Sequence, residues 1–357
     1  MKKMNFLQLG LSFAGCFLGA GYVSGQELWQ FFGSFGRAGV AGLVLAVLLL
    51  FVIGAIMLRL GQLTGLSEPD RIVVRRNIPP LRYAVTALEL LFLFGVSTIM
   101  AAGVGALLRQ LIGLPAWIGS AAFTLLVAAI SLAGLQGMVS AFSVSVPILI
   151  AVTLYFGVSS LSGGIPEAPV RAESANSLIG SWPAAAVSFA CYNVFGSIAM
   201  IAPLGRFVNG RKTAVAGIAA GAAMLLLIAG SVLACLFSAP EAAGSELPML
   251  ALASARASWL GYVYGLLLLL AMFGTALSSM VAFLNMLCLK LKKPHRGTLT
   301  ALYALGMFGG SLFGFGDLIG TVYPLFGYCS SVFIVLMAVH YFKVRKNERT
   351  QNQAPLL

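Results

Sequence analysis

The sequence predicts an all-helical membrane protein with ten transmembrane helices, arranged as two five-helix repeats of opposite orientation. Three observations support this fold class: the composition, the number of long apolar segments, and the repeated spacing of those segments. Of 357 residues, 60% are hydrophobic and 9% are charged, and the mean hydropathy is +0.98. Soluble domains are about half apolar and about a quarter charged. This composition therefore excludes a water-soluble globular domain.

Ten apolar segments are separated by charged or Pro/Gly-rich breaks. A helix needs about 20 apolar residues to cross a bilayer, so each segment is a candidate span. The segments are 5–33, 38–62, 83–110, 115–133, 136–160, 182–206, 213–237, 259–288, 298–315 and 318–342.

The basic residues are distributed unequally between the two sides that these spans define. Of 22 Lys and Arg residues, 18 lie on the side of the chain termini, and only Arg37, Arg109, Arg171 and Arg256 lie on the other. Cytoplasmic loops carry the excess of basic residues in membrane proteins. We therefore expect a multi-pass protein of the cell membrane with both termini in the cytoplasm. The net charge of +12 then belongs to loops beside the bilayer and does not indicate a nucleic-acid partner.

The spacing of the segments repeats after 175 residues. Segment 38–62 moves onto 213–237, and 83–110 moves close to 259–288. Because five spans is an odd number, the second copy enters the membrane from the opposite side, as in transporters with inverted repeats. We divide the chain into a first repeat (1–160), an extracellular connection (161–181), a second, inverted repeat (182–342) and a cytoplasmic tail (343–357).

The first segment contains an unusual number of glycines: Gly15, Gly19, Gly21 and Gly25. Each glycine in a helix costs about 1 kcal/mol relative to alanine, so the cluster predicts a break near residues 19–22. A break frees carbonyls, which suit a small cation, and N–H groups, which suit a carboxylate. The alternative is that these glycines only let two helices approach closely.

The sixth segment has polar residues in the middle of an apolar span, where Tyr192 and Asn193 precede Gly196 and Ser197. This segment corresponds to the first one in the repeat, and paired interruptions of this kind mark transporter binding sites. We therefore expect a second broken helix between Cys191 and Gly196. Asn193 can instead form a single hydrogen bond between helices.

The eighth segment contains Thr275 followed by Ser278 and Ser279. Both serines lie on the helix face that carries the Thr275 carbonyl, so the three residues can offer oxygen ligands to an alkali cation. Serine and threonine also bond back to their own helix, which is the commoner role for any single one.

These motifs resemble a known superfamily. The stretch Ala14–Gly21 resembles the broken first helix of LeuT-type transporters in the amino acid–polyamine–organocation superfamily, and Thr275–Ser279 resembles their eighth-helix cation motif. The stretch Gly19–Glu27 is closer still to the YkvI-like amino acid permeases. The resemblance covers the ten-span chain, but segment six lacks the glycine-rich unwinding of many relatives, and the chain ends after the tenth span.

The resemblance implies a sodium site and a substrate site, and no other cofactor. The implied sodium ligands are carbonyls of Gly15, Leu18 and Thr275 with the hydroxyls of Ser278 and Ser279. The implied substrate site consists of N–H groups near Ala20, Gly21 and Tyr22 together with Cys191, Tyr192, Asn193 and Phe195.

Two acids lie within spans, and acids at such positions are candidate functional groups. Glu27 lies roughly 33 Å along its segment, near the outer boundary, where it can form an outer gate or simply be solvated. Glu89 lies roughly 9 Å from the inner edge and can take up a proton or line the inner pathway. Every lysine lies on the cytoplasmic side, so no lysine ammonium can replace a sodium ion. Sodium is the expected coupling ion, with the proton as second choice.

The function that these features predict is secondary active transport of a small amino acid or related zwitterion by alternating access. The alternative is a membrane subunit on the same fold that senses a ligand without net transport, as in spore germinant receptors. The sequence contains no HExxH or GxSxG motif, and we do not expect an enzyme.

Overall fold

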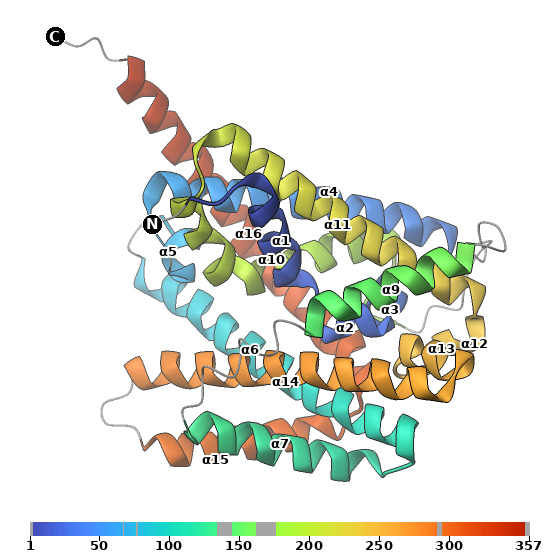
Figure 1. Cartoon of the computed structure of the whole chain (residues 1–357). Coiled ribbons are helices and arrows are strands. Elements are labelled where there is room, and N and C mark those ends of the chain that lie inside the picture. Colours follow the sequence, from blue (N-terminus) through green and yellow to red (C-terminus); the bar gives the residue numbers. More distant parts are fainter. Residues whose placement is uncertain are drawn as a thin grey trace.

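The protein is described here by a computed structural model covering residues 3–66, 68–75, 78–133, 145–161, 176–290 and 295–353. Apart from one isolated bridge between Met4 and Val208, the regular elements in these residues are helices (Figure 1). Seven of them are long and apolar enough to cross a membrane. They are α4 (Arg37–Thr64), α6 (Pro79–Ile112), α7 (Ala116–Ala133), α10 (Trp182–Leu204), α11 (Gly210–Ser238), α14 (Ser258–Lys290) and α16 (Phe315–Gln353). The prediction of an all-helical multi-pass membrane protein is confirmed.

Three shorter helices coincide with the remaining apolar segments. They are α1 (Phe6–Phe17), α9 (Ser145–Leu161) and α15 (Arg296–Ser311). Residues 134–144, most of the 161–181 connection and residues 354–357 lie outside the described residues. Three further helices were not expected from hydropathy because they lie in loops: α5 (Pro69–Val73), α12 (Pro240–Ala243) and α13 (Pro248–Arg256).

Local sequence explains where several helices begin and end. The Asn5 side chain accepts a hydrogen bond from the Gln8 N–H (2.8 Å), and the Gln8 side chain accepts one from the Asn5 N–H, which caps the start of α1. Helices α4 and α6 end at Gly65 and Gly113, whose φ angles of 65° and 71° lie in the left-handed region that glycine tolerates.

The predicted break in the first segment is present. Helix α1 ends at Phe17, α2 (Ala20–Ser24) follows, and Gly25, with a φ of 86°, separates α2 from α3 (Gln26–Phe31). A Cβ atom added at Gly15 or at Gly19 would meet nothing within 4 Å. These two glycines therefore do not serve close helix packing.

The predicted break in the sixth segment is wrong, because α10 is continuous through residues 191–196. Its polar residues bond back to their own helix: the Asn193 amide donates to the Phe189 carbonyl and the Ser197 hydroxyl donates to the Val194 carbonyl. Gly196 admits the ring of Phe92, which a Cβ would strike. One glycine used for packing does not unwind a helix as the glycine cluster of the first segment does.

The helices pack in pairs that the 175-residue shift interchanges. Helix α1 packs on α11, and α4 packs on α10; the shift turns the first pair into the second. In the same way, α9 packs on α11 and α16 on α4, while α7 packs on α6 and α15 on α14. The two longest central helices, α6 and α14, pack on each other.

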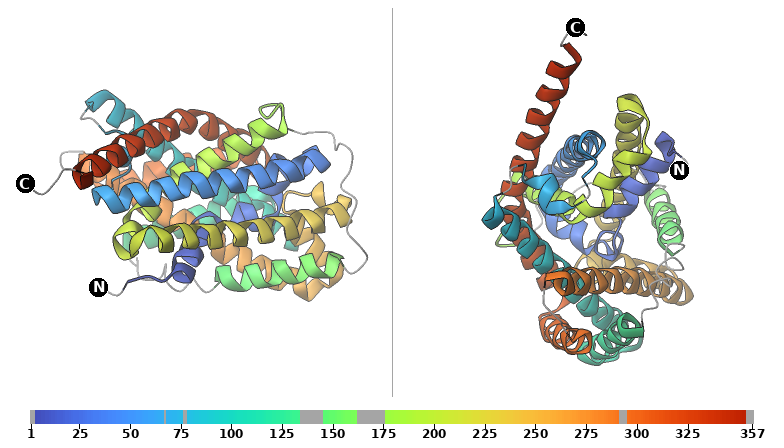
Figure 2. Two further views of the ribbon diagram at one scale, coloured as in Figure 1. Left: turned by 90° about the horizontal axis from the view of Figure 1, so that it is seen from above. Right: turned by 90° about the vertical axis from the view of Figure 1, so that its left-hand side faces the viewer.

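The charged contacts fall at the two ends of this bundle. The two termini lie at the same end (Figure 2), where Lys3 bonds to Asn209, and Arg59 pairs with Glu348 at 3.1 Å. At the opposite end, where α6 and α13 finish, Arg109 pairs with Glu246 and Arg256 donates to the Ser159 hydroxyl.

Candidate functional site

The broken first segment carries Glu27 into the interior of the bundle. Glu27 lies in the first turn of α3 and is 5% exposed. Its Oε1 accepts a hydrogen bond from the Tyr192 hydroxyl of α10, and a Cβ built on Gly21 would lie 2.6 Å from its Oε2. The carboxyl group therefore lies between α2 and α10. The expectation that Glu27 is solvated at the outer boundary is wrong, because the chain folds back at Gly25 instead of continuing as one helix.

Aromatic rings surround the Glu27–Tyr192 pair. The ring of Tyr192 stacks on Tyr323 of α16, with centroids 4.7 Å apart and an interplanar angle of 13°. Phe31 and Phe189 also contact Tyr192, at 5.7 and 5.6 Å. None of the ion pairs found among the described residues includes Glu27. A carboxylate in such surroundings is costly unless a cation pairs with it, so the site can hold either a proton or a cationic group beside Glu27.

The residues expected to hold a substrate carboxylate are already in use. The Tyr22 N–H donates to the Gly19 carbonyl (3.1 Å), and its hydroxyl donates to the Leu225 carbonyl of α11 (2.8 Å). Ala20 is fully buried, and the space beside Gly21 is occupied by the Glu27 carboxyl group. A second carboxylate here would be repelled by an ionised Glu27. The geometry therefore favours a cationic group over a carboxylate at this point.

The four predicted residues of α10 do not act together. Tyr192 bonds to Glu27, and the Asn193 side chain lies near the same carboxyl group. Cys191 is buried, while Phe195 packs against Phe333 of α16 at 6.0 Å. Two of the four residues therefore face the centre of the site.

The five predicted sodium ligands lie on α1, its C-cap and α14. The Ser278 hydroxyl donates to the Thr275 carbonyl (3.0 Å), and the Thr275 hydroxyl donates to the Ala271 carbonyl (2.9 Å). Ser279 is buried, whereas Gly15 and Ser278 are exposed and Leu18 is buried at the end of α1. No hydrogen bond among the described residues joins Gly15 or Leu18 to the three residues of α14. The sodium site stays a prediction.

Glu89 lies away from the break, in the first third of α6, and is half-buried. Its predicted role in proton uptake or in the inner pathway also stays a prediction.

Several residues at the centre were not identified from the sequence. Tyr323 stacks on Tyr192, and the Tyr264 hydroxyl of α14 donates to the Val23 carbonyl (2.7 Å), next to the break, while lying 3.1 Å from the Thr153 hydroxyl. The available signal was a tyrosine inside an apolar span, because a buried phenol group needs a hydrogen-bond partner.

Comparison with known proteins supports the membrane assignment. No family model matches the chain. It is 25% identical over 347 residues to the uncharacterized membrane protein YkvI of Bacillus subtilis, covering 93% of this chain and 95% of that protein. It is 26% identical over 333 residues to the uncharacterized protein YyaD of Bacillus subtilis, covering 91% and 94% of the two chains.

Solved structures with a similar fold are transporters. An inward-facing conformation of Mhp1 superposes with a TM-score of 0.63 at 16% identity, covering 97% of this chain and 80% of that one. A variant of the Eremococcus coleocola manganese transporter superposes with a TM-score of 0.57 at 17% identity, covering 92% and 76%. The chain is thus a multi-pass helical membrane protein with the LeuT-type fold of these transporters. In line with the expectation that it is not an enzyme, both titles describe membrane transport proteins.

Proposed function

We propose that this protein is a secondary active transporter of the cell membrane that moves a small amino acid or related zwitterion by alternating access. In this proposal the chain has ten spans in a 5+5 inverted repeat, and both termini are cytoplasmic. The ten apolar segments each contain a helix, and the packing pairs that interchange under the 175-residue shift support the repeat. The basic residues support the orientation.

The observation that carries the proposal is the buried Glu27 carboxyl group at the break between α2 and α3. The amino group of a zwitterion can pair with this carboxylate, and a proton can neutralise it when no substrate is bound. Helices interrupted inside a membrane are tolerated where they line a binding site. An empty structural break would leave backbone groups without a function in a region where they are costly.

Coupling to sodium rests on the resemblance of Thr275–Ser279 to a cation motif, and coupling to protons rests on Glu27. The TM-score to inward-facing Mhp1 is 0.63, whereas the score to Mhp1 in a closed conformation with bromovinylhydantoin bound is 0.56, at 17% identity with 97% and 80% coverage. This difference supports an inward-facing state of the present chain. In such a state the proposed sodium ligands on α1 and α14 are open to the cytoplasm.

The test is uptake of radiolabelled amino acids by proteoliposomes that contain only this protein. An inward sodium gradient should drive accumulation, and the Glu27→Gln variant should accumulate about tenfold less or worse, because it removes the charge that pairs with the amino group. Accumulation driven by a pH gradient alone would assign coupling to protons. Saturable binding without uptake under either gradient would instead identify a ligand-sensing subunit.

A further inference from the structure

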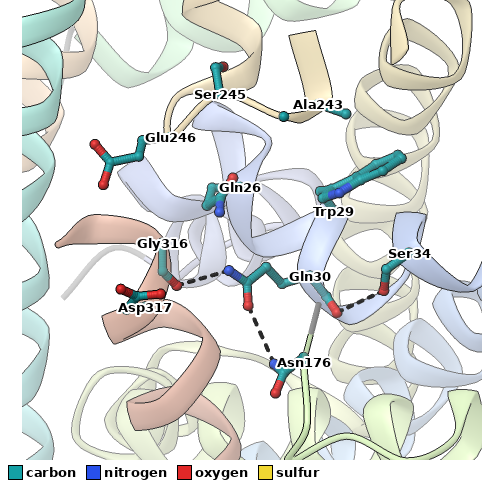
Figure 3. Close-up of a pocket in the computed structure, with 11 residues that line it drawn as sticks. Gln26, Trp29, Gln30, Ser34, Asn176, Ala243, Ser245, Glu246, Gly316 and Asp317 are labelled. Carbon is teal, nitrogen blue, oxygen red and sulfur yellow. Dashed lines mark hydrogen bonds between the residues drawn. The ribbon is translucent and has the colours of Figure 1, made fainter. Parts of the chain in front are cut away.

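A second polar cavity lies at the end of the bundle away from the termini, outside the Glu27 centre. It has a volume of about 340 Å³ and lies between α3, the loop before α13 and the start of α16 (Figure 3). We name it the Gln26 cavity. Its lining residues are Gln26, Trp29, Gln30, Ser34, Asn176, Ala243, Gly244, Ser245, Glu246, Gly316 and Asp317. Small-molecule sites are typically of this size, about 300 Å³ or larger.

The Gln26 cavity contains a buried acceptor without a hydrogen-bond partner. Gln26 is 8% exposed, and its Oε1 has no partner in the structure although it is inaccessible to solvent. Figure 3 shows Gln26 in the middle of the lining residues, with Glu246 and Asp317 on one side and Trp29 on the other. An unsatisfied buried carbonyl costs about 1 to 3 kcal/mol, so a ligand that donates to it recovers a substantial free energy.

The neighbouring amides are already paired and do not compete for that ligand. The Gln30 amide donates to the Gly316 carbonyl (2.8 Å), and its oxygen accepts a hydrogen bond from the Asn176 amide (3.4 Å). These contacts fix one wall of the cavity, between α3 and α16. Gln26 Oε1 is left as the acceptor that a ligand can reach with a hydrogen bond.

The charge of the cavity is negative. Glu246 and Asp317 are the charged residues among its lining residues, and Glu246 is paired with Arg109. A Cβ built on Gly314 would lie 3.4 Å from Glu246 Oε1 and 3.9 Å from Asp317 Oδ2, so both carboxylates flank the same point. Two carboxylates and one guanidinium leave one negative charge that is not balanced within this group.

A donor-rich organic cation fits this lining better than an inorganic ion. Calcium or sodium requires several oxygen ligands around one point, whereas Trp29 and Ala243 contribute apolar surface. An ammonium group can donate to Gln26 Oε1, pair with Asp317 and place its carbon atoms against the indole ring. We propose that the Gln26 cavity binds the ammonium group of an organic cation through the Gln26 carbonyl and the Asp317 carboxylate.

This inference deepens the proposed function, because it rests on that function for the idea that the bound amine then passes to Glu27. Binding itself does not require transport and can be measured alone. The probe is butylammonium, with butanol as the neutral analogue of the same chain length and potassium as the inorganic cation. The full-length protein is placed in phosphatidylglycerol nanodiscs, which contain no amine head group, and binding is measured by ligand-observed NMR.

Butylammonium should bind saturably, and neither butanol nor potassium should displace it at equal concentration. Asp317→Asn and Gln26→Leu should each weaken its binding about tenfold or more, because each removes one partner of the ammonium group. The matched control is Glu241→Gln, which changes an exposed acid of neighbouring α12 that does not line the cavity and should leave the affinity unchanged. The inference is overturned if butanol or potassium binds equally well, if wild-type protein does not bind, or if the Asp317 and Gln26 variants bind like wild type.

The Glu27→Gln variant separates this inference from the proposed function. Butylammonium binding that survives in Glu27→Gln and is lost in Asp317→Asn supports the Gln26 cavity even if no amino acid is transported. Binding that is lost in Glu27→Gln and unchanged in Asp317→Asn places the amine at Glu27 and contradicts the role of the cavity. Enrichment of added phosphatidylethanolamine around wild-type protein, but not around Asp317→Asn, would identify a lipid head group as the source of the ammonium.

Discussion

The Glu27 carboxyl group accepts a hydrogen bond from the hydroxyl of Tyr192, a residue 165 positions later in the chain. This contact joins α3, which follows the break in the first segment, to α10, which occupies the corresponding place in the second half of the chain. A proton or an amine that binds Glu27 changes the partner of Tyr192, whose ring is stacked on Tyr323 of α16. Ligand binding at one carboxyl group can therefore alter the contacts among three helices.

Replacing Glu27 by glutamine tests this centre without removing its volume. Glutamine can still accept the hydrogen bond from Tyr192, but it cannot carry a negative charge. We expect the Glu27→Gln variant to fold and to lose about tenfold or more in amino acid uptake, because the charge-assisted contact to the substrate is lost. Uptake is measured in proteoliposomes beside the Glu241→Gln control. Wild-type uptake in Glu27→Gln would rule out an essential negative charge at this position.

Two glycines of the break provide a matched pair of substitutions. A Cβ at Gly21 would lie 2.6 Å from Glu27 Oε2, whereas a Cβ at Gly19 would meet nothing within 4 Å. We expect Gly21→Ala to displace the Glu27 side chain and to weaken substrate binding about tenfold, and Gly19→Ala to have little effect. Binding of the transported amino acid is measured by isothermal titration. Equal affinities in the two variants would mean that the Gly21–Glu27 contact has no role in the site.

Hydropathy, charge and repeat spacing predict the fold well because each reflects a requirement of the bilayer. The ten apolar segments and the glycine-rich break of the first helix follow from the cost of exposing polar groups to lipid. The break predicted in α10 is wrong because Asn193 and Ser197 bond back to their own helix, a choice that the sequence of a polar residue does not reveal.

The site is predicted less completely because its centre depends on the direction of the chain after the break. Counting 1.5 Å per residue from Asn5 places Glu27 near the outer boundary, but that count assumes one straight helix. The positive φ of Gly25 redirects the chain and buries Glu27 against Tyr192. Tyr323, the stacking partner of Tyr192, lies 131 residues further along the chain, and no local pattern pairs the two rings.

The turn at Gly25 should be essential for stability. Its φ of 86° costs a residue with a Cβ about 1 to 2 kcal/mol, and the added Cβ would lie 3.1 Å from Met249 Cγ. We expect Gly25→Ala to lower the thermal unfolding temperature in detergent. The control is Gly230→Ala on α11, where the Cβ meets nothing within 4 Å and where alanine should stabilise the helix by up to about 1 kcal/mol. Unfolding temperatures that rise in both variants would show that α2 and α3 do not depend on this turn.

The last prediction concerns the proposed sodium site and separates its two hydroxyl groups. Ser278 donates its proton to the Thr275 carbonyl, so its oxygen can still face a cation, while Ser279 is buried on the same helix. If Gly15, Leu18, Thr275, Ser278 and Ser279 enclose sodium, the ion is held by three carbonyls and two hydroxyls without a formal negative charge. Removing either hydroxyl should then weaken sodium binding by about 1.5 to 3 kcal/mol, or roughly ten- to a hundredfold. Ser278→Ala and Ser279→Ala should accordingly raise the sodium concentration that gives half-maximal uptake. Ser238→Ala on α11 is the control, because its hydroxyl donates to the Ala234 carbonyl of its own helix and belongs to no proposed site. If both serine variants match wild type across a sodium titration, their hydroxyls serve only their own helix, and Glu27 becomes the coupling group through protonation.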